Sequence, residues 1–206
     1  MNGMKHIVNF IMEIFTLKHL QRSSYQTLGV KSGTIADHTF SMAIIGYCLA
    51  KMENADVDRV VKMCLFHDLV ETRTGDANFP QQRYQLLLEE KAMRDMTKNL
   101  PDEMKDEIRN LFLEFEKGKT KEAKVAREAD KLEQLFQEKR HIESGVKEAE
   151  GWLDYSLKNL QLRSSKKIGK TASEGRFSDW WAPLSQEPPL KARKKGIASL
   201  LKIITK

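Results

Sequence analysis

Two of the five histidines in this 206-residue chain stand next to aspartates. His38 follows Asp37, and His67 is followed directly by Asp68 within an otherwise apolar helical pattern. Glu71 comes four residues after His67, a spacing that places both side chains on one side of a helix. Imidazole and carboxylate groups ligate divalent metals and transfer protons, so these residues could support hydrolytic chemistry.

A further carboxylate, Asp130, lies in a later helical pattern among the apolar residues Ala126, Ala129 and Leu132. A carboxylate on an apolar stripe is costly to bury unless it is paired or bound to a cation. Taken singly, each residue has an ordinary explanation: a lone histidine is commonly a hydrogen-bonded core residue, and Asp130 has Lys131 beside it. The complete set, a histidine, a His-Asp pair and a later aspartate, is what indicates a metal site.

In nearly every segment that must position these residues, apolar side chains recur at spacings of three and four residues, as in a helix. We predict helices over residues 4–20, 38–52, 57–71, 83–99, 101–118, 120–141 and 147–161. Asp56 and Thr120 are suitable N-caps, and Gly118 is a suitable stop. Gly75 and Pro80 interrupt the pattern after Glu71 and predict a loop. No alternating polar and apolar run is long enough for a strand, so the predicted fold class is all-α, a helical bundle.

Composition excludes several classes of protein. The longest apolar stretch, around Phe40 to Ala50, is shorter than the roughly 20 residues that a membrane span needs, so we expect no integral membrane protein. Glu13 interrupts the apolar N-terminal run, which makes it a poor signal peptide. Both cysteines, Cys48 and Cys64, fall in apolar helical patterns and are interpreted as buried thiols, which favours a cytoplasmic protein.

The formal net charge of +6 belongs to the end of the chain. Six basic and no acidic residues lie from Pro188 to Lys206, so residues 1–187 carry no net charge. We expect one domain over residues 1–183 and a linker with a basic tail over residues 184–206. The tail fits two interpretations: a solvated end, or a short amphipathic helix that contacts an anionic membrane surface or a nucleic acid.

Three segments together carry a family resemblance: ADHTFSMAIIGYCLA, CLFHDLVETRTGD and READKLEQLFQ. In this order they resemble the HD-domain metal-dependent phosphohydrolases, whose signature is H…HD…D, and within them the 5′-deoxynucleotidase branch. The resemblance covers roughly residues 8–181. It implies an HD-domain helical bundle, a small-molecule nucleotide substrate and a homodimer.

The resemblance also implies a ligand set for one divalent metal, made of His38, His67, Asp68 and Asp130. Two imidazoles and two carboxylates suit a borderline transition metal such as Mn²⁺, Co²⁺, Ni²⁺ or Zn²⁺ better than Ca²⁺. A metal held there would lower the pKa of a water molecule, orient it and screen the charge of a phosphate.

Four further assignments follow from the resemblance alone. Glu71 corresponds to the acid–base group at the phosphoester. Asp68, one of the implied metal ligands, is also assigned a catalytic role. Asp76 corresponds to a residue near the deoxyribose, and Arg22 to an arginine whose guanidinium suits a phosphate. The chain departs from the family near that arginine, where a tryptophan is common, because it reads RSSYQTLGV with Tyr25.

The resulting hypothesis is a metal-dependent phosphomonoesterase, which would hydrolyse deoxyribonucleoside 5′-monophosphates to deoxynucleoside and phosphate with a metal-activated water. One alternative is an HD hydrolase of another nucleotide: a deoxynucleoside triphosphate, a cyclic nucleotide or an alarmone. Thr72 stands where alarmone hydrolases tend to carry a second acidic residue, which disfavours that option. The other alternative is a catalytically inactive helical nucleotide-binding protein, which the presence of all four ligands and of Glu71 disfavours.

Overall fold

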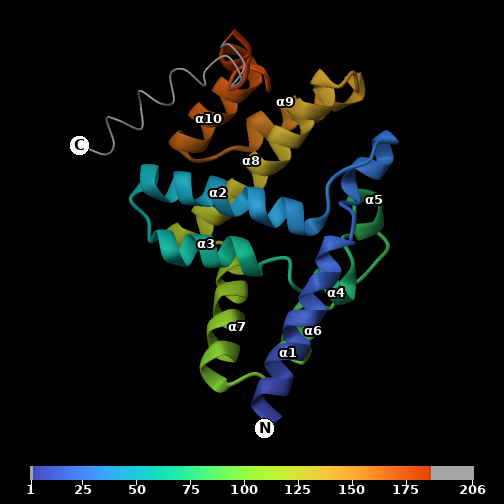
Figure 1. The fold of residues 1–206 in the computed structure, drawn as a ribbon, viewed down its shortest axis with the longest axis vertical. Helices are drawn as coiled ribbons and strands as arrows, with labels where there is room; N and C mark the ends of the chain where they lie inside the picture. Colours follow the sequence, from blue (N-terminus) through green and yellow to red (C-terminus); the bar gives the residue numbers. More distant parts are fainter. Residues whose placement is uncertain (1, 187–206) are drawn as a thin grey trace, which may run out of the picture.

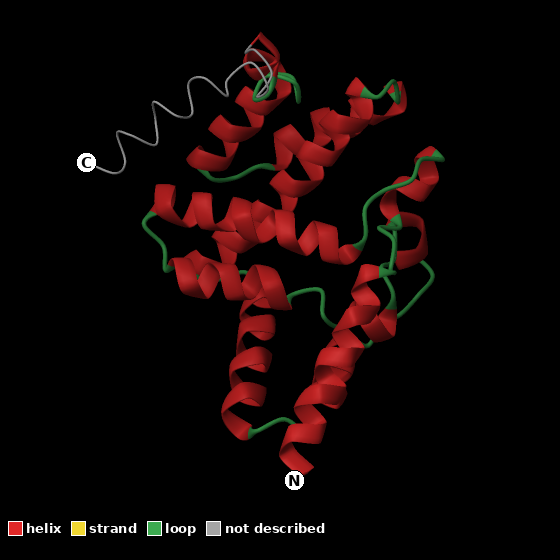
Figure 2. Cartoon of the chain, viewed as in Figure 1, coloured by secondary structure: helices red, strands yellow, loops and turns green. Residues whose placement is uncertain are grey.

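The computed structural model describes residues 2–186, and these residues fold into helices joined by short turns and loops (Figures 1 and 2). The helices are α1 (Asn2–Ile14), α2 (Ile35–Glu53), α3 (Val57–Phe66), α4 (Glu71–Thr74), α5 (Phe79–Gln82), α6 (Glu89–Thr97), α7 (Asp102–Lys117), α8 (Lys121–Glu143), α9 (Glu150–Asn159) and α10 (Arg163–Glu174). Among the described residues, β-type pairing is limited to one isolated bridge between Gln21 and Thr34. The all-α prediction is therefore confirmed.

The centre of the fold is the crossing of α2, α3 and α8 (Figure 1). Their buried faces share one apolar core that includes Met42, Val60 and Leu132. Gly46 permits the close approach of α2 to α3, because a β-carbon there would lie 2.7 Å from the sulfur of Cys64. A second core joins α1, α6 and α7 and includes Met93.

Capping residues set where the central helices begin and end. The side chain of Thr34 accepts the backbone N–H of Asp37, and Asp37 returns a bond to Thr34, so α2 begins with a reciprocal cap. Asp56 and Thr120 cap α3 and α8, as predicted. Gly118 ends α7 with a φ of 59°, a left-handed conformation that glycine adopts without strain.

The prediction of one continuous helix over residues 57–71 is wrong over its last third. Helix α3 ends at Phe66, residues 67–70 form turns, and α4 begins at Glu71. In a continuing helix the carbonyl of Cys64 would accept the backbone N–H of Asp68, whereas here it lies 2.9 Å from the ring nitrogen Nδ1 of His67. His67 and Glu71 therefore do not lie on one unbroken helix, contrary to the prediction.

Other differences lie toward the surface. Residues 83–88 are outside α6, which begins at Glu89 rather than at residue 83. Helix α10 was not predicted, because its buried positions include Ser164, Ser165 and Gly169 and so give no apolar period. Cys64 is buried as expected, but Cys48 is exposed, so its interpretation as a buried thiol was wrong.

No helix in the described part of the chain is long and apolar enough to cross a membrane. The predicted basic tail, with most of the linker before it, falls in residues 187–206 and lies outside the described residues.

Candidate active site

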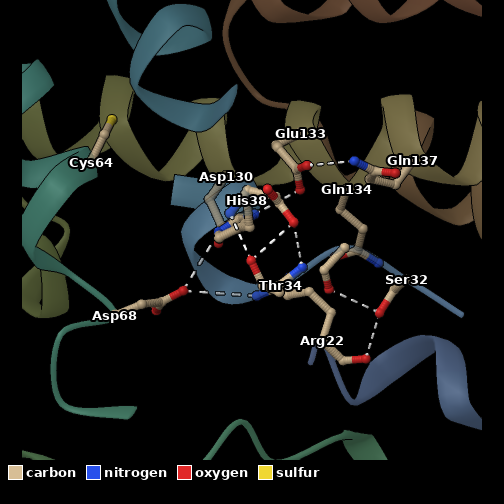
Figure 3. Close-up of polar contacts among 12 residues, drawn as sticks. Arg22, Ser32, Thr34, His38, Cys64, Asp68, Asp130, Glu133, Gln134 and Gln137 are labelled. Atoms are coloured by element: carbon tan, nitrogen blue, oxygen red, sulfur yellow. Dashed lines mark hydrogen bonds and ion pairs between the residues drawn. The ribbon is translucent and has the colours of Figure 1, made fainter. Parts of the chain in front are cut away.

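Three elements that are far apart in the sequence bring the predicted metal ligands together (Figure 3). His38 lies in the first turn of α2, His67 and Asp68 follow the end of α3, and Asp130 lies in α8. One ligand atom from each of His38, His67 and Asp68 falls within a group whose members are all within 4.8 Å of one another. The short loop between α3 and α4 therefore meets the start of α2 over the middle of α8.

The distances within this cluster are close to those between atoms that share one ion. The two Nε2 atoms of His38 and His67 are 3.4 Å apart. Asp68 Oδ2 lies 3.1 Å from His67 Nε2 and 3.5 Å from His38 Nε2. Asp130 Oδ1 lies 3.5 Å from His38 Nε2, with a side chain that is more exposed than the other three. His38, His67 and Asp68 therefore form one compact group, and Asp130, which lies outside that group, approaches it at His38.

Both imidazole rings are held by their other nitrogen. His38 Nδ1 lies 2.7 Å from the carboxylate of Glu133, and His67 Nδ1 lies 2.9 Å from the carbonyl of Cys64. Carboxylate and carbonyl oxygens only accept, so each Nδ1 carries the proton and donates it. In the neutral rings each Nε2 then presents a lone pair to the cluster, the form in which histidine ligates a metal.

The donor set fits a divalent transition metal. Two facing Nε2 lone pairs repel each other unless a metal ion or a proton lies between them. Asp68 Oδ2 is buried and, within residues 2–186, accepts no hydrogen bond despite its short distances to both rings. Nitrogen and oxygen ligands in this mixture suit Mn²⁺, Co²⁺, Ni²⁺ or Zn²⁺. The thiol of Cys64 takes no part, since burial, with Asp130 nearby, raises its pKa to about 12.

Electrostatics couple the histidine and aspartate of the pair. Burial alone would lower the pKa of His67, but the carboxylate of Asp68 outweighs it and the pKa of His67 is raised. Burial would raise the pKa of Asp68, yet His67, His38 and Arg22 together hold it well below its usual range. Asp68 is therefore ionised at neutral pH and available as a ligand.

Glu71 opens α4 beside the cluster, and its carboxyl has a strongly shifted pKa. Burial first, and then the negative charges of Asp68 and Asp76, raise the pKa of Glu71 to about 10, although Arg22 acts in the opposite direction. Its Oε2 is buried and has no hydrogen-bond partner among the described residues. Glu71 thus holds a proton at neutral pH, and its Oε2 makes no hydrogen bond to the described part of the chain.

Arg22 is the cation that faces these carboxylates. Its Nη1 lies 3.8 Å from Asp68 Oδ2, and its pKa is raised: burial alone would lower it, but Asp68, Asp130 and Asp76 outweigh that effect. The backbone of Arg22 is fixed by two hydrogen bonds, from its N–H to Gly33 and from the Ser32 hydroxyl to its carbonyl. Its Nε is buried and makes no hydrogen bond within residues 2–186.

A hydrogen bond to the backbone of Ser23 holds the side chain of Asp76 next to the segment that carries Arg22. Asp76 Oδ2 accepts the N–H of Ser23 at 2.6 Å, which ties the loop after α4 to the segment that carries Arg22. Tyr25 lies in the segment where related proteins commonly carry a tryptophan. Its side chain is 2% exposed and packs on His141 and Trp152. Its ring is therefore part of the interior and not available to a bound molecule.

Glu133, the carboxylate that holds His38, is not among the site residues predicted from the sequence. It lies three residues after Asp130 on α8, so both point toward α2 (Figure 3). Glu133 is buried, and its other oxygen accepts a hydrogen bond of 3.0 Å from the Nε2 of Gln137. That three-residue spacing was the signal that could have identified it.

The chain is similar to known proteins over most of its length. The protein family described as HD domain matches residues 14–175. A protein named 5′-deoxynucleotidase HDDC2 from Dictyostelium discoideum is 33% identical over 147 residues, which cover 65% of this chain and 76% of that protein. A protein named 5′-deoxynucleotidase hdd1 from Schizosaccharomyces pombe is 31% identical over 141 residues, 64% of this chain and 70% of that protein.

A solved structure gives the same result for the fold. The crystal structure of a protein from Pyrococcus horikoshii OT3 superposes with a TM-score of 0.68 at 27% sequence identity. The match covers 81% of this chain and 98% of that one.

Proposed function

This chain belongs to the HD-domain family, and from that premise we propose that it is a metal-dependent phosphomonoesterase acting on deoxyribonucleoside 5′-monophosphates. The products would be a deoxynucleoside and phosphate. The chain is an HD-domain phosphohydrolase related to proteins named 5′-deoxynucleotidase at about 30% identity. The names of these relatives support the choice of substrate class.

His38, His67, Asp68 and Asp130 would hold one divalent metal ion. When bound, the metal would supply an activated water nucleophile and would screen the charge of the phosphate. The chain contributes the orientation of the ligands: Glu133 and the Cys64 carbonyl fix both imidazole rings with Nε2 toward the cluster. The low pKa of Asp68 keeps that carboxylate ionised at neutral pH.

Arg22 would bind the phosphate. It is buried among carboxylates, and a phosphate oxygen would give its Nε the acceptor that the described chain does not supply. A guanidinium presents its donors in a planar fork that matches phosphate oxygens. The backbone bonds to Gly33 and Ser32 fix the position from which Arg22 would reach the substrate.

Glu71 would act as the general acid. Its raised pKa keeps a proton on the carboxyl at neutral pH, and the leaving 5′-oxygen of the substrate needs one. A positive ion bound at Asp68 would offset part of the negative charge that raises this pKa and so would bring it closer to neutrality. Such a value suits a group that must both give and regain a proton.

Asp76 would recognise the sugar. Its Oδ2 is engaged by the backbone of Ser23, so the other carboxylate oxygen would accept the 3′-hydroxyl of the deoxyribose. A carboxylate at that position would crowd a 2′-hydroxyl, which would favour deoxyribonucleotides over ribonucleotides.

The observation that carries this proposal is the convergence of buried polar atoms without partners in the described chain. Asp68 Oδ2, Glu71 Oε2 and Arg22 Nε all belong to neighbouring residues whose charges shift one another's pKa values. Buried polar groups are normally satisfied, so a cation and an anion bound together would explain all three.

Phosphate release from dAMP, dGMP, dCMP, dTMP, dUMP and AMP, measured with added Co²⁺ or Mn²⁺, tests the proposal. We expect release from the deoxy compounds, little from AMP, and none from the variant Asp68→Asn. If the protein binds metal but releases phosphate from no monophosphate, the proposal fails, and triphosphates, cyclic nucleotides and alarmones become the substrates to examine. No metal binding and no activity would favour the inactive nucleotide-binding alternative.

A homodimer, which the family resemblance implies, is a second part of the proposal. The exposed apolar side chains on several helices are consistent with a further interface.

A further inference from the structure

The outer face of helix α10 is basic. Four basic side chains on this face are all exposed: Arg163, Lys166, Lys167 and Lys170. Residues three, four and seven positions apart lie on one side of a helix, so the four side chains form a single stripe. The opposite side of α10 is buried through Ser164, Ser165 and Gly169. We call the four basic residues the α10 stripe.

Neighbouring carboxylates leave most of the α10 stripe uncompensated. Glu53 and Glu143 each accept a backbone N–H near one end of α10, so their charges serve the chain's own backbone. Lys170 has an acidic partner, Glu174, whose carboxylate lies 3.8 Å from its Nζ. Within residues 2–186 the other three cations of the stripe form no ion pair, which leaves them free to attract an anionic partner.

The net charge of the protein is concentrated in the part of the chain that begins with α10. Residues 163–206 contain 11 basic and 3 acidic residues, a net charge of +8, whereas residues 1–162 carry a net charge of −2. The described share, residues 163–186, has five basic and two acidic residues. It lies at the end of the molecule opposite the N-terminus (Figure 1). This end of the fold therefore presents a positive surface.

Large apolar side chains follow the α10 stripe and are exposed as well. Trp180, Trp181 and Leu184 have exposed fractions of 75%, 47% and 55%. Tryptophan is enriched where lipid meets water, because its ring is apolar and its N–H is polar. Residues 187–206 lie outside the described part of the chain, and their sequence adds six basic residues and an apolar set at helical spacing, Ile197, Leu200, Leu201 and Ile204.

This combination fits an anionic lipid surface better than a nucleic acid. Both are polyanions that would attract the α10 stripe, and tryptophan rings also stack on bases. Leu184 and the aliphatic residues of the last segment have no ring with which to stack. Aliphatic side chains gain instead by entering the boundary between headgroups and acyl chains, where apolar burial and electrostatic attraction act together.

The basic surface and the candidate active site lie at opposite ends of α2. His38 is in the first turn of α2, and Glu53, at its last residue, contacts the start of α10. The 15 residues between these two positions correspond to about 22 Å of helix. Attachment through α10 is therefore separate from the binding of a nucleotide near His38.

We propose that the α10 stripe, together with Trp180, Trp181 and Leu184, docks this protein on an anionic membrane surface. The cations of the stripe contact lipid phosphates, and the exposed apolar side chains enter the headgroup region. This attachment is peripheral and reversible, since it depends on surface charge and on a few apolar side chains.

Flotation of the full chain with lipid vesicles tests the proposal. We expect binding to vesicles that mix phosphatidylcholine with phosphatidylglycerol, and none to phosphatidylcholine alone. High salt should weaken the binding, because ions screen exposed charges. Binding is measured without metal or nucleotide, so its outcome does not depend on the proposed function. No binding to the anionic vesicles would overturn the proposal.

Matched pairs of lysines separate the α10 stripe from positive charge in general. Each basic side chain near an anionic lipid surface strengthens binding about fivefold, so the double variant Lys166→Gln, Lys167→Gln should bind the vesicles about 10- to 30-fold more weakly. The control Lys117→Gln, Lys119→Gln removes the same charge from exposed positions at the end of α7 and should bind like the wild type. Circular dichroism checks that both keep their helix content. Equal affinities in the two double variants would contradict the proposal.

Tryptophan fluorescence tests the apolar part of the surface. Anionic vesicles should shift the emission of the wild type to shorter wavelength, and the double variant Trp180→Ala, Trp181→Ala should lose both this shift and part of the binding. Vesicle binding without any change in emission would refute the role of the two tryptophans. Anisotropy with a short single-stranded DNA examines the other polyanion: binding to the DNA but not to the vesicles would assign the stripe to a nucleic acid and overturn the proposal.

Discussion

The carboxylate of Glu133 lies 2.7 Å from Nδ1 of His38, although the two residues are 95 positions apart in the chain. The contact joins α8 to the first turn of α2 and fixes which nitrogen of the imidazole carries the proton. It therefore decides that Nε2 faces His67, Asp68 and Asp130. A partner of this kind orients a metal ligand and raises its basicity.

Glu133→Gln should weaken metal binding without unfolding the protein. The amide keeps the shape of the side chain but loses the negative charge that stabilises the Nδ1–H tautomer of His38. We expect the affinity for Co²⁺ to fall about 10- to 100-fold, measured by calorimetric titration. Glu122→Gln, on the same helix at its distant first turn, is the control and should bind Co²⁺ like the wild type. Equal affinities in both variants would show that Glu133 does not position His38.

Much of the candidate site was predictable from the sequence. His38, His67, Asp68 and Asp130 were selected by a motif, and the structure brings their side chains together around His38. Their roles as ligands stay a prediction. Local chemistry also predicted the caps at Asp56 and Thr120, because capping depends on residues a few positions apart.

Features that depend on long-range contacts were not predictable in this way. The pairing of Glu133 with His38 requires the crossing of α8 and α2, which no local pattern contains. The break after Phe66 accompanies a side-chain contact, from His67 to the Cys64 carbonyl, that competes with helix continuation. Helix α10 packs through small residues such as Gly169, whose β-carbon would lie 2.6 Å from Leu160. A helix that is buried through glycine and serine has no hydrophobic periodicity from which it could be predicted.

Gly46→Ala should destabilise the crossing that holds the site. The added methyl group would lie 2.7 Å from the sulfur of Cys64 and 3.3 Å from Val60, so α2 and α3 must separate slightly. Overpacking of this kind typically costs about 1–3 kcal/mol of unfolding free energy, measured by urea denaturation. Gly151→Ala in α9 is the matched control: nothing lies within 4 Å of its β-carbon, so it should be neutral or slightly stabilising. A Gly46 variant as stable as the Gly151 variant would contradict the close approach.

Glu128 should contribute stability that depends on pH. It is buried, and its carboxylate accepts hydrogen bonds from the backbone of Gln161 and Leu162 and from Ser165 at the start of α10. Burial alone would raise the pKa of Glu128, but these bonds and Lys131 outweigh it and the pKa is lowered. We expect Glu128→Gln to lose about 1–3 kcal/mol of unfolding free energy at pH 7.

The sign of the pH effect follows from the lowered pKa. A carboxylate with a lower pKa in the folded than in the unfolded chain stabilises the fold above the unfolded value, about 4.3 for glutamate. This contribution is lost as the pH falls through the folded pKa. The stability difference between wild type and Glu128→Gln should therefore shrink below about pH 4, whereas exposed Glu150→Gln should differ little from wild type at any pH. A difference that stays constant with pH would argue against an ionised Glu128.

Glu71→Gln should separate catalysis from metal binding. The amide occupies the same volume but holds no transferable proton, so the turnover number for a deoxyribonucleoside 5′-monophosphate should fall about 10²- to 10⁴-fold. The increase in melting temperature on adding Co²⁺ should remain, because Glu71 is not among the proposed ligands. Asp68→Asn should lose both, since this residue touches His67 and His38 directly. If Glu71→Gln kept its turnover number, Glu71 would not be the general acid and another group would have to supply the proton to the 5′-oxygen.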